Sequence, residues 1–200
     1  MRRRHGGWCE GDETKYRLDG DGYSDIMKIY LAGPDVFRPE ATAWADAVRE
    51  LCRQHGVEAL TPLDHSETLP HKICEGNLEL IRKAQIVVAN LNPFRGAEPD
   101  SGTAFELGYA LALGKKLWGY VERGDTVVER VRRLDAKVSI TGSGPRDAQG
   151  WVIEDFALPV NLMLAMSAQI VVGDLADCLN AIRPRRADVE AGKSSTAVTH

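Results

Sequence analysis

The chain has 200 residues, of which 44% are hydrophobic and 27% charged, so it can bury one good-sized hydrophobic core and is expected to form one domain. Its formal net charge of −4, with basic and acidic residues interspersed, excludes a basic surface for nucleic acid. The four cysteines lie far apart without a C-x-x-C pair, which favours a reducing compartment over a zinc site, and the lack of a long apolar run predicts a cytoplasmic protein that does not enter a membrane.

The two ends of the chain are expected to lie outside the folded domain. Residues 1–26 are polar, rich in glycine and aspartate and without periodicity, which predicts a disordered leader. Residues 184–200 are small and polar and predict a flexible tail. The domain is therefore expected to occupy residues 27–183.

Between the ends, short β-branched runs alternate with longer amphipathic segments. In chain order, the pattern predicts strands at Lys28–Ala32, Val57–Thr61, Ile86–Leu91, Lys116–Val121 and Gln169–Val172. It predicts helices at Pro39–His55, Lys72–Ala84, Thr103–Leu113, Val127–Leu134, Pro159–Ser167 and Leu175–Ile182. We therefore expect a doubly wound α/β fold, flavodoxin-like or Rossmann-like, with a five-stranded parallel sheet and helices on both faces. Ligands bind such sheets outside the carboxyl ends of the strands.

The loop after the first strand reads Gly33-Pro34-Asp35-Val36-Phe37. It matches neither the G-x-G-x-x-G loop nor the Walker phosphate loop, so neither a dinucleotide nor a P-loop nucleotide cofactor is indicated. A tight turn already explains the Gly-Pro pair. Alternatively, Gly33 permits close backbone approach, Asp35 offers a polar contact, and Phe37 offers an aromatic face to a flat ligand such as a nucleobase.

The segment after the third strand carries two carboxylates, Asp100 and Glu106, on either side of a Ser-Gly-Thr turn that enters a helix. We expect Glu106 in the first helical turn, where the positive end of the helix dipole keeps a carboxylate ionised. An ionised, fixed carboxylate suits a nucleophile in glycosyl transfer. Alternatively, Thr103 and Glu106 form a capping box, in which Glu106 only accepts a backbone hydrogen bond. Gly108, inside the helix, suggests close approach of a strand or a ligand.

Four segments together resemble the nucleoside 2-deoxyribosyltransferase family, and the third is the most diagnostic. They are Ile29-Tyr30-Leu31-Ala32-Gly33-Pro34; Ile86 to Leu91 followed by Asn92-Pro93-Phe94-Arg95-Gly96; Asp100-x-Gly102-Thr103-x-x-Glu106-x-Gly108-x-Ala110; and Asn161-Leu162-Met163. The resemblance implies that Glu106 is the nucleophile that forms a deoxyribosyl-enzyme intermediate. It also implies that Asp100 contacts the bound nucleoside and that Asn161 reaches into the adjacent subunit's active site to bind the sugar 5'-hydroxyl.

The remaining expected substrate-binding residues are Gly33, Asp35, Phe37, Asn77 and Gly102. Some family members have an aspartate at the position of Asn77 that can protonate the leaving base, which an asparagine cannot do as an acid. Asp35, Asp100 or water remain as proton donors. Asn161 also has a simpler interpretation as a helix cap, since Pro159-Val160-Asn161 begins a predicted helix.

The resemblance implies transfer of 2-deoxyribose between nucleobases with retention, without metal or organic cofactor. The expected partners are 2'-deoxynucleosides, free nucleobases and further copies of this chain in a homo-oligomer with shared active sites. One alternative is a hydrolase of 2'-deoxynucleosides or of their 5'-monophosphates, although an acidic Asp35 in the loop after the first strand is expected to repel a phosphate. Another is a nucleotide-sensing module without turnover, which has no need of both Asp100 and Glu106.

Overall fold

A computed structural model describes residues 26–134 and 137–182, so nearly all of the expected leader and all of the expected tail lie outside the described residues. The main sheet contains β1 (Lys28–Ala32), β2 (Glu58–Leu60), β3 (Ile86–Asn90), β4 (Lys116–Val121) and β7 (Gln169–Val172). The helices are α1 (Ala41–Gln54), α2 (Pro70–Lys83), α3 (Ser101–Ala112), α4 (Val127–Leu134), α5 (Leu162–Ser167) and α6 (Leu175–Ile182), with a short 3₁₀ turn η1 (Pro34–Phe37) after β1.

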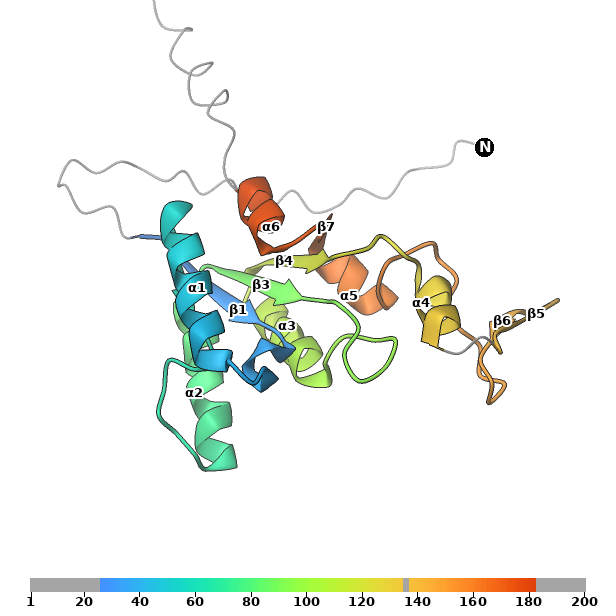
Figure 1. The fold of residues 1–200 in the computed structure, drawn as a ribbon, viewed down its shortest axis with the longest axis horizontal. Helices are drawn as coiled ribbons and strands as arrows, with labels where there is room; N and C mark the ends of the chain where they lie inside the picture. The colour runs from blue at the N-terminus through green and yellow to red at the C-terminus, as the bar shows by residue number, and fades with distance from the viewer. Residues whose placement is uncertain (1–25, 135–136, 183–200) are drawn as a thin grey trace, which may run out of the picture.

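The main sheet is entirely parallel, in the order β2-β1-β3-β4-β7 (Figure 1). This is the strand order of a flavodoxin-like doubly wound fold, which confirms the predicted fold class. The direction of winding reverses between β1 and β3, so the loops after these strands diverge at a topological switch point. Ligands of open α/β sheets bind at this place.

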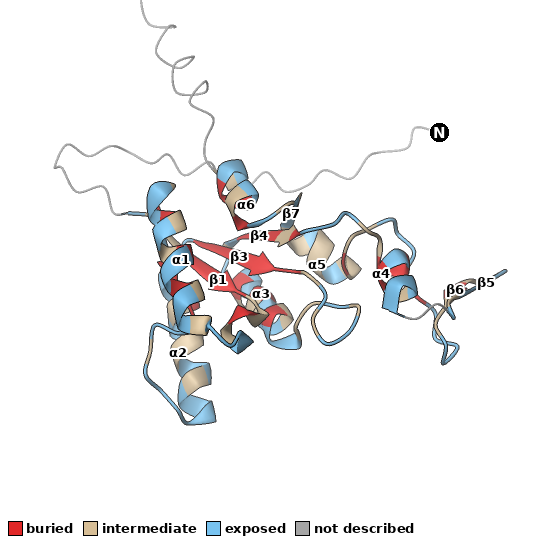
Figure 2. Cartoon of the chain, viewed as in Figure 1, coloured by how far each residue is buried: buried red, intermediate tan, exposed pale blue. Residues whose placement is uncertain are grey.

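Helices cover both faces of the sheet because the strand side chains alternate between the two faces. Ile29 and Leu31 pack with α1 and α6, while Tyr30 and Ala32 pack with residues of α2 and α3. Burial is concentrated in the strands, and the outer sides of the helices are exposed (Figure 2). The alternation turns the Tyr30 side chain toward α3.

Most predicted elements are found within one to three residues of their predicted ends, and β1, β4, β7, α4 and α6 match their predicted ranges. The prediction missed the antiparallel hairpin of β5 (Ser139–Thr141) and β6 (Gly144–Arg146). Its strands have three residues each, and β6 contains glycine and proline, so neither shows an alternating pattern. The hairpin and α4 lie away from α1 and α2, beyond the carboxyl ends of the main strands (Figure 1).

Among residues 26–134 and 137–182, no helix has the length and apolar character that crossing a membrane requires. Over the same ranges, no group of three or more histidine, cysteine, aspartate and glutamate side chains is placed to hold a metal ion.

Candidate active site

Glu106 is hydrogen-bonded to Tyr30 across the interface between α3 and the sheet. The phenol Oη of Tyr30 donates to Glu106 Oε1 at 2.5 Å, and the two residues are 76 positions apart in the chain. Tyr30 is completely buried, because it lies in the middle of β1 on the face that α3 covers. The other oxygen, Oε2, has no hydrogen-bond partner among the described residues, so it remains free for a reacting group.

Burial raises the pKa of Glu106 to about 7 from its usual 4.5, the Tyr30 hydrogen bond lowers it, and the charge of Asp100 raises it. The pKa of Tyr30 is raised, first by burial and then by Glu106, so Tyr30 stays a protonated donor. The expected placement of Glu106 in the first helical turn is wrong, because α3 begins at Ser101. Glu106 lies in the second turn, where burial and Tyr30, rather than the helix dipole, control its charge.

Asp100 is the N-cap of α3, so the alternative of a capping box between Thr103 and Glu106 is wrong. Its Oδ2 accepts hydrogen bonds from Thr103 N at 3.0 Å and from Thr103 Oγ1 at 3.3 Å. Gly102 lies against the same carboxylate, and a Cβ there would stand 2.9 Å from Asp100 Oδ2. Both residues therefore have a structural role at the start of the helix that carries Glu106.

Asp35 and Asn90 form a buried polar contact beside Gly33, at the switch point between β1 and β3. Asn90 Nδ2 donates to Asp35 Oδ2 at 2.8 Å, and Arg38 Nε donates to Asp35 Oδ1 at 2.7 Å. Asp35 is only 4% exposed and forms an ion pair with Arg38, and the expectation that it repels a phosphate stays a prediction. A Cβ at Gly33 would stand 2.9 Å from the Cβ of Asn90, which explains the glycine by close approach.

The sequence interpretation missed Tyr30 and Asn90 as site residues. Asn90 Oδ1 accepts from Asn92 Nδ2 at 2.8 Å, and Asn92 Oδ1 accepts from the backbone N–H of Glu122 at 2.8 Å. This chain of side-chain amides joins the carboxyl ends of β3 and β4. A polar residue that ends an otherwise apolar strand is the signal that could have found Asn90, and a tyrosine inside a buried strand is the signal for Tyr30.

Phe37 forms an exposed aromatic surface with Phe94 from the loop after β3. The rings stack with centroids 5.6 Å apart and planes 13° apart, and the guanidinium of Arg95 lies 5.2 Å from the Phe37 ring and 4.7 Å from the Phe94 ring. The two rings line a hollow of about 250 Å³ together with Asp35 and Asn90, among others. Phe37 is 57% exposed, so part of its ring stays accessible beside Phe94 and Arg95.

Asn77 and Asn161 are each held by a partner within the chain. Asn77, on α2, pairs with His65, whose Nε2 lies 2.9 Å from Asn77 Oδ1. Asn161 is the N-cap of α5, where Oδ1 accepts from Met163 N at 2.9 Å and Nδ2 donates to Glu154 Oε1 at 2.9 Å. The cap interpretation of Asn161 is therefore confirmed, and its role toward a neighbouring subunit stays a prediction.

The predicted site residues thus fall into separate groups on one chain. Gly33, Asp35 and Phe37 gather at the end of β1, whereas Asp100, Gly102 and Glu106 belong to α3. In the described residues, Glu106 makes no hydrogen bond to another predicted site residue, and the hollow beside Phe37 is not lined by Glu106. Gly108 is exposed, and apart from its chain neighbours and its own helix backbone no atom lies within 4 Å of a Cβ built there. Of the two explanations for this glycine, the approach of a strand is wrong and the approach of a ligand stays a prediction.

A known protein structure shares this fold. A structure described as a 2-desoxiribosyltransferase from Leishmania mexicana superimposes with a TM-score of 0.66 and 36% sequence identity, covering 78% of this chain and 95% of that chain. A 2-deoxyribosyltransferase from the bacterium Bacillus psychrosaccharolyticus shows a more partial likeness, with a TM-score of 0.41, 25% identity and coverage of 53% of this chain and 80% of that chain.

An uncharacterized protein of Schizosaccharomyces pombe is 33% identical over 172 residues, covering 74% of this chain and 82% of its own length. Residues 29–163 match the sequence profile described as Nucleoside 2-deoxyribosyltransferase. This match extends from β1 to α5, so it includes Tyr30, Glu106 and Asn161. The chain belongs to the nucleoside 2-deoxyribosyltransferase family.

Proposed function

We propose that this protein transfers 2-deoxyribose between nucleobases, with Glu106 as the nucleophile. The observation that carries the proposal is the hydrogen bond from the buried Tyr30 to the half-buried Glu106, in a chain of this family. Tyr30 fixes one carboxylate oxygen and leaves Oε2 for attack on the sugar. A pKa of about 7 makes Glu106 ionised in a large share of molecules at neutral pH while keeping it basic.

The reaction consists of two displacements at C1'. In the first, Glu106 Oε2 forms a bond to C1', the bond from C1' to the base nitrogen breaks, and its electron pair leaves with the base, which takes up a proton. In the second, a nitrogen of the incoming base attacks C1', the glutamyl ester bond breaks, and that base loses a proton. Two inversions give net retention. The missing 2'-hydroxyl helps, because its electron withdrawal would oppose positive charge at C1'.

The proton for the leaving base has three candidate sources, which are Asp35, Asp100 and water. Both Asp35 oxygens already accept hydrogen bonds from Arg38 and Asn90, which suits an acceptor better than an acid. Asp100 has one oxygen occupied by its cap, and Oδ1 has no hydrogen-bond partner among the described residues. Since the negative charge of Asp100 raises the pKa of Glu106, we propose water as the donor, and Phe37 as an aromatic face for the base.

We also propose that the active unit is a homo-oligomer in which Asn161 serves the neighbouring subunit's site. Helices α3 and α5 pack against each other and carry exposed apolar side chains: Phe105 is 59%, Leu111 50%, Met163 68% and Met166 61% exposed. Exposed apolar surface of this extent on two adjacent helices is typical of an interface. A second copy on this surface would cover the outer side of the helix that carries Glu106.

The proposed activity is tested with deoxyinosine, incubated with and without adenine and followed by chromatography. New deoxyadenosine that depends on the enzyme and on Glu106 is the expected result. Free hypoxanthine formed equally with and without adenine would instead assign a hydrolase. No change in either mixture would favour a sensing module and overturn the proposal.

A further inference from the structure

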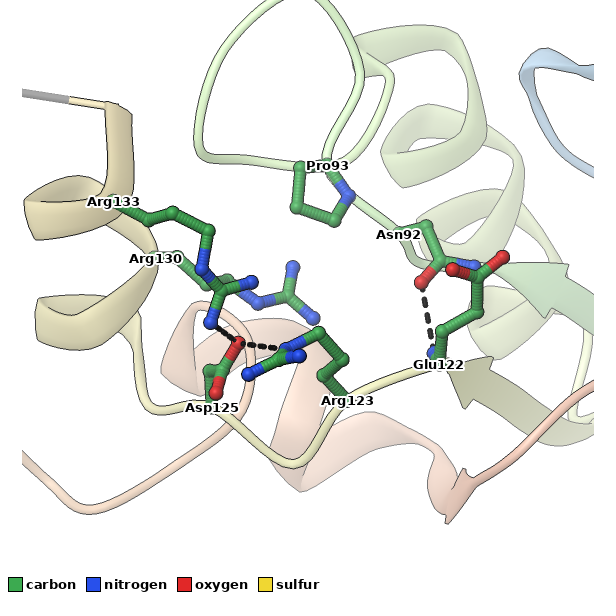
Figure 3. A pocket seen from close by; sticks show the side chains of 7 residues that line it. All are labelled: Asn92, Pro93, Glu122, Arg123, Asp125, Arg130 and Arg133. Atoms are coloured by element: carbon green, nitrogen blue, oxygen red, sulfur yellow. Dashed lines mark hydrogen bonds and ion pairs between the residues drawn. The ribbon is translucent and has the colours of Figure 1, made fainter.

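A hollow of about 290 Å³ lies at the carboxyl ends of β3 and β4, beside α4 (Figure 3). It is lined by Asn92, Pro93, Glu122, Arg123, Asp125, Arg130 and Arg133. Three of these seven residues are arginines, and Figure 3 shows their side chains reaching toward the same space from α4 and from the segment after β4. Glu106 does not line this hollow, so the hollow is separate from the proposed nucleophile.

Asp125 organises two of the arginines. Its Oδ2 accepts hydrogen bonds from Arg123 Nε at 3.0 Å and from Arg133. The Asp125 side chain is 17% exposed, whereas those of Arg123 and Arg133 are 67% and 47% exposed. One carboxylate therefore holds two guanidinium groups at the rim of the hollow, and each guanidinium keeps further N–H groups free to bind a ligand.

Arg130 is the unusual member of the group. It is only 4% exposed, and burial lowers the pKa of its guanidinium, which shows how little water solvates its charge. Its Nη1 donates to the backbone oxygen of Leu91 at 3.0 Å. Among the described residues no carboxylate lies within ion-pair distance of Arg130, and its other N–H groups have no hydrogen-bond partner. Burial outweighs the charges of Glu98 and Asp125, which raise the pKa of Arg130 from beyond ion-pair distance, so no direct anionic partner in the described part of the chain compensates this buried charge.

Phosphate is the anion that best fits this arrangement. Guanidinium groups bind phosphate oxygens in a planar, two-pronged way, and several arginines around one space are typical of phosphate recognition. The hollow has the volume of roughly ten liquid waters, which exceeds the needs of a phosphate alone. Asn92, Pro93 and Glu122 also line the hollow beside Phe37 and Phe94, so the two spaces adjoin. A phosphate bound in the first hollow would therefore lie beside the hollow that Phe37 and Phe94 line.

We propose that the hollow between Arg123, Arg130 and Arg133 is a binding site for a phosphate group, taken either as inorganic phosphate or as the phosphate of a nucleotide. Arg130 supplies the buried charge, and Arg123 and Arg133 close over the anion from the rim. Through its hydrogen bond to Leu91, Arg130 also connects the site to the loop that leads into α3. The proposal does not depend on transferase activity, because binding is measured without turnover.

The test is calorimetric titration of the full chain with sodium phosphate at a fixed ionic strength maintained with chloride. Wild type should bind phosphate, and Arg123→Gln and Arg133→Gln should each weaken binding at least threefold. Each single variant leaves the other arginine on Asp125, so the fold is expected to persist. Arg130→Lys, which keeps the charge but not the planar fork, should weaken binding further. Arg132→Gln is the matched control, since Arg132 is an exposed arginine of the same helix outside the hollow.

Two further titrations, with 2'-deoxyadenosine 5'-monophosphate and with 2'-deoxyadenosine, distinguish the sources of the phosphate. Tighter binding of the monophosphate than of both phosphate and nucleoside, lost in Arg123→Gln and Arg133→Gln, would assign a nucleotide. Arginine-dependent binding of inorganic phosphate that the nucleoside part does not strengthen would assign the free anion. The proposal is overturned if neither inorganic phosphate nor the monophosphate binds with a Kd below about 10 mM. It is equally overturned if Arg132→Gln weakens binding as much as the rim variants do.

Discussion

Tyr30 donates a 2.5 Å hydrogen bond to Glu106, and this contact links the centre of the sheet to the helix that carries the proposed nucleophile. A hydrogen bond to a carboxylate favours its ionised form, so Tyr30 opposes the effect of burial on Glu106. The tyrosine is a positioning residue in this scheme. It holds Oε1, and it brings the pKa of Glu106 down toward the range in which a nucleophile works.

Tyr30→Phe should move the pH dependence of the transferase. Without the donor, the pKa of Glu106 rises above about 7, so the acidic limb of kcat/KM should move to higher pH by about one pH unit. The loss of activity should accordingly be larger at pH 6 than at pH 8.5. The measurement is kcat/KM for base exchange over pH 5 to 9.

Tyr109→Phe is the matched control for this experiment. Tyr109 lies on α3, and its hydroxyl has no hydrogen-bond partner among the described residues, while its ring lies under Arg82 at 5.6 Å. Removing this hydroxyl should leave the pH profile unchanged. A parallel drop of the Tyr30→Phe rate at all pH values would assign Tyr30 a role in the fold or in binding instead.

Glu106→Gln should abolish transfer and stabilise the protein at alkaline pH. The folded pKa of Glu106 is about 7 and its ordinary value is 4.5. Between pH 4.5 and pH 7 the folded state binds more protons at Glu106 than the unfolded state does. The free energy of unfolding therefore falls as pH rises through this range, and above pH 7 the whole loss of stability persists. The advantage of the glutamine variant over wild type should grow by roughly 2–3 kcal/mol between pH 5 and pH 8.

Urea denaturation of both proteins at pH 5 and pH 8 measures this difference, and other titrating groups cancel in the comparison. Transfer should fall by several orders of magnitude, because the covalent step has no substitute nucleophile. An active Glu106→Gln protein would exclude the proposed mechanism. Equal stability differences at the two pH values would show that Glu106 is not held in its protonated form by burial.

Asp100 caps the N-terminus of α3 and also raises the pKa of Glu106 through its charge, and two variants separate these roles. Asp100→Ala should lower stability by about 1 kcal/mol, because α3 loses its N-cap, whereas Asp100→Asn should stay close to wild type, because asparagine caps equally well. Both remove the charge that raises the pKa of Glu106, so both should move the acidic limb to lower pH. Thermal unfolding and kcat/KM profiles of the three proteins are the measurements. Different pH shifts in the two variants would contradict an electrostatic role for Asp100.

The sequence predicts the fold better than it predicts the contacts of the site. Strand alternation and helix periodicity are local properties, so β1 and β4 were predicted to the residue. The environment of Glu106 depends on Tyr30, 76 positions away, and no local pattern encodes that pairing. The same is true of Asp35, which reads as an exposed loop charge until Arg38 and Asn90 are placed against it.

Asn161→Ala and Glu106→Ala should each be nearly inactive but should restore activity when mixed, if Asn161 serves the neighbouring subunit's site. Random exchange in a dimer places both intact residues together in about a quarter of all sites, so recovered activity should stay well below wild type. Asn161 also caps α5 and binds Glu154, so Asn161→Ser, which keeps a capping oxygen and loses the amide, is the companion variant. Subunit exchange is verified with differently tagged copies before assay of deoxyribosyl transfer. A monomer by sedimentation, or no recovery after verified exchange, would refute the shared site.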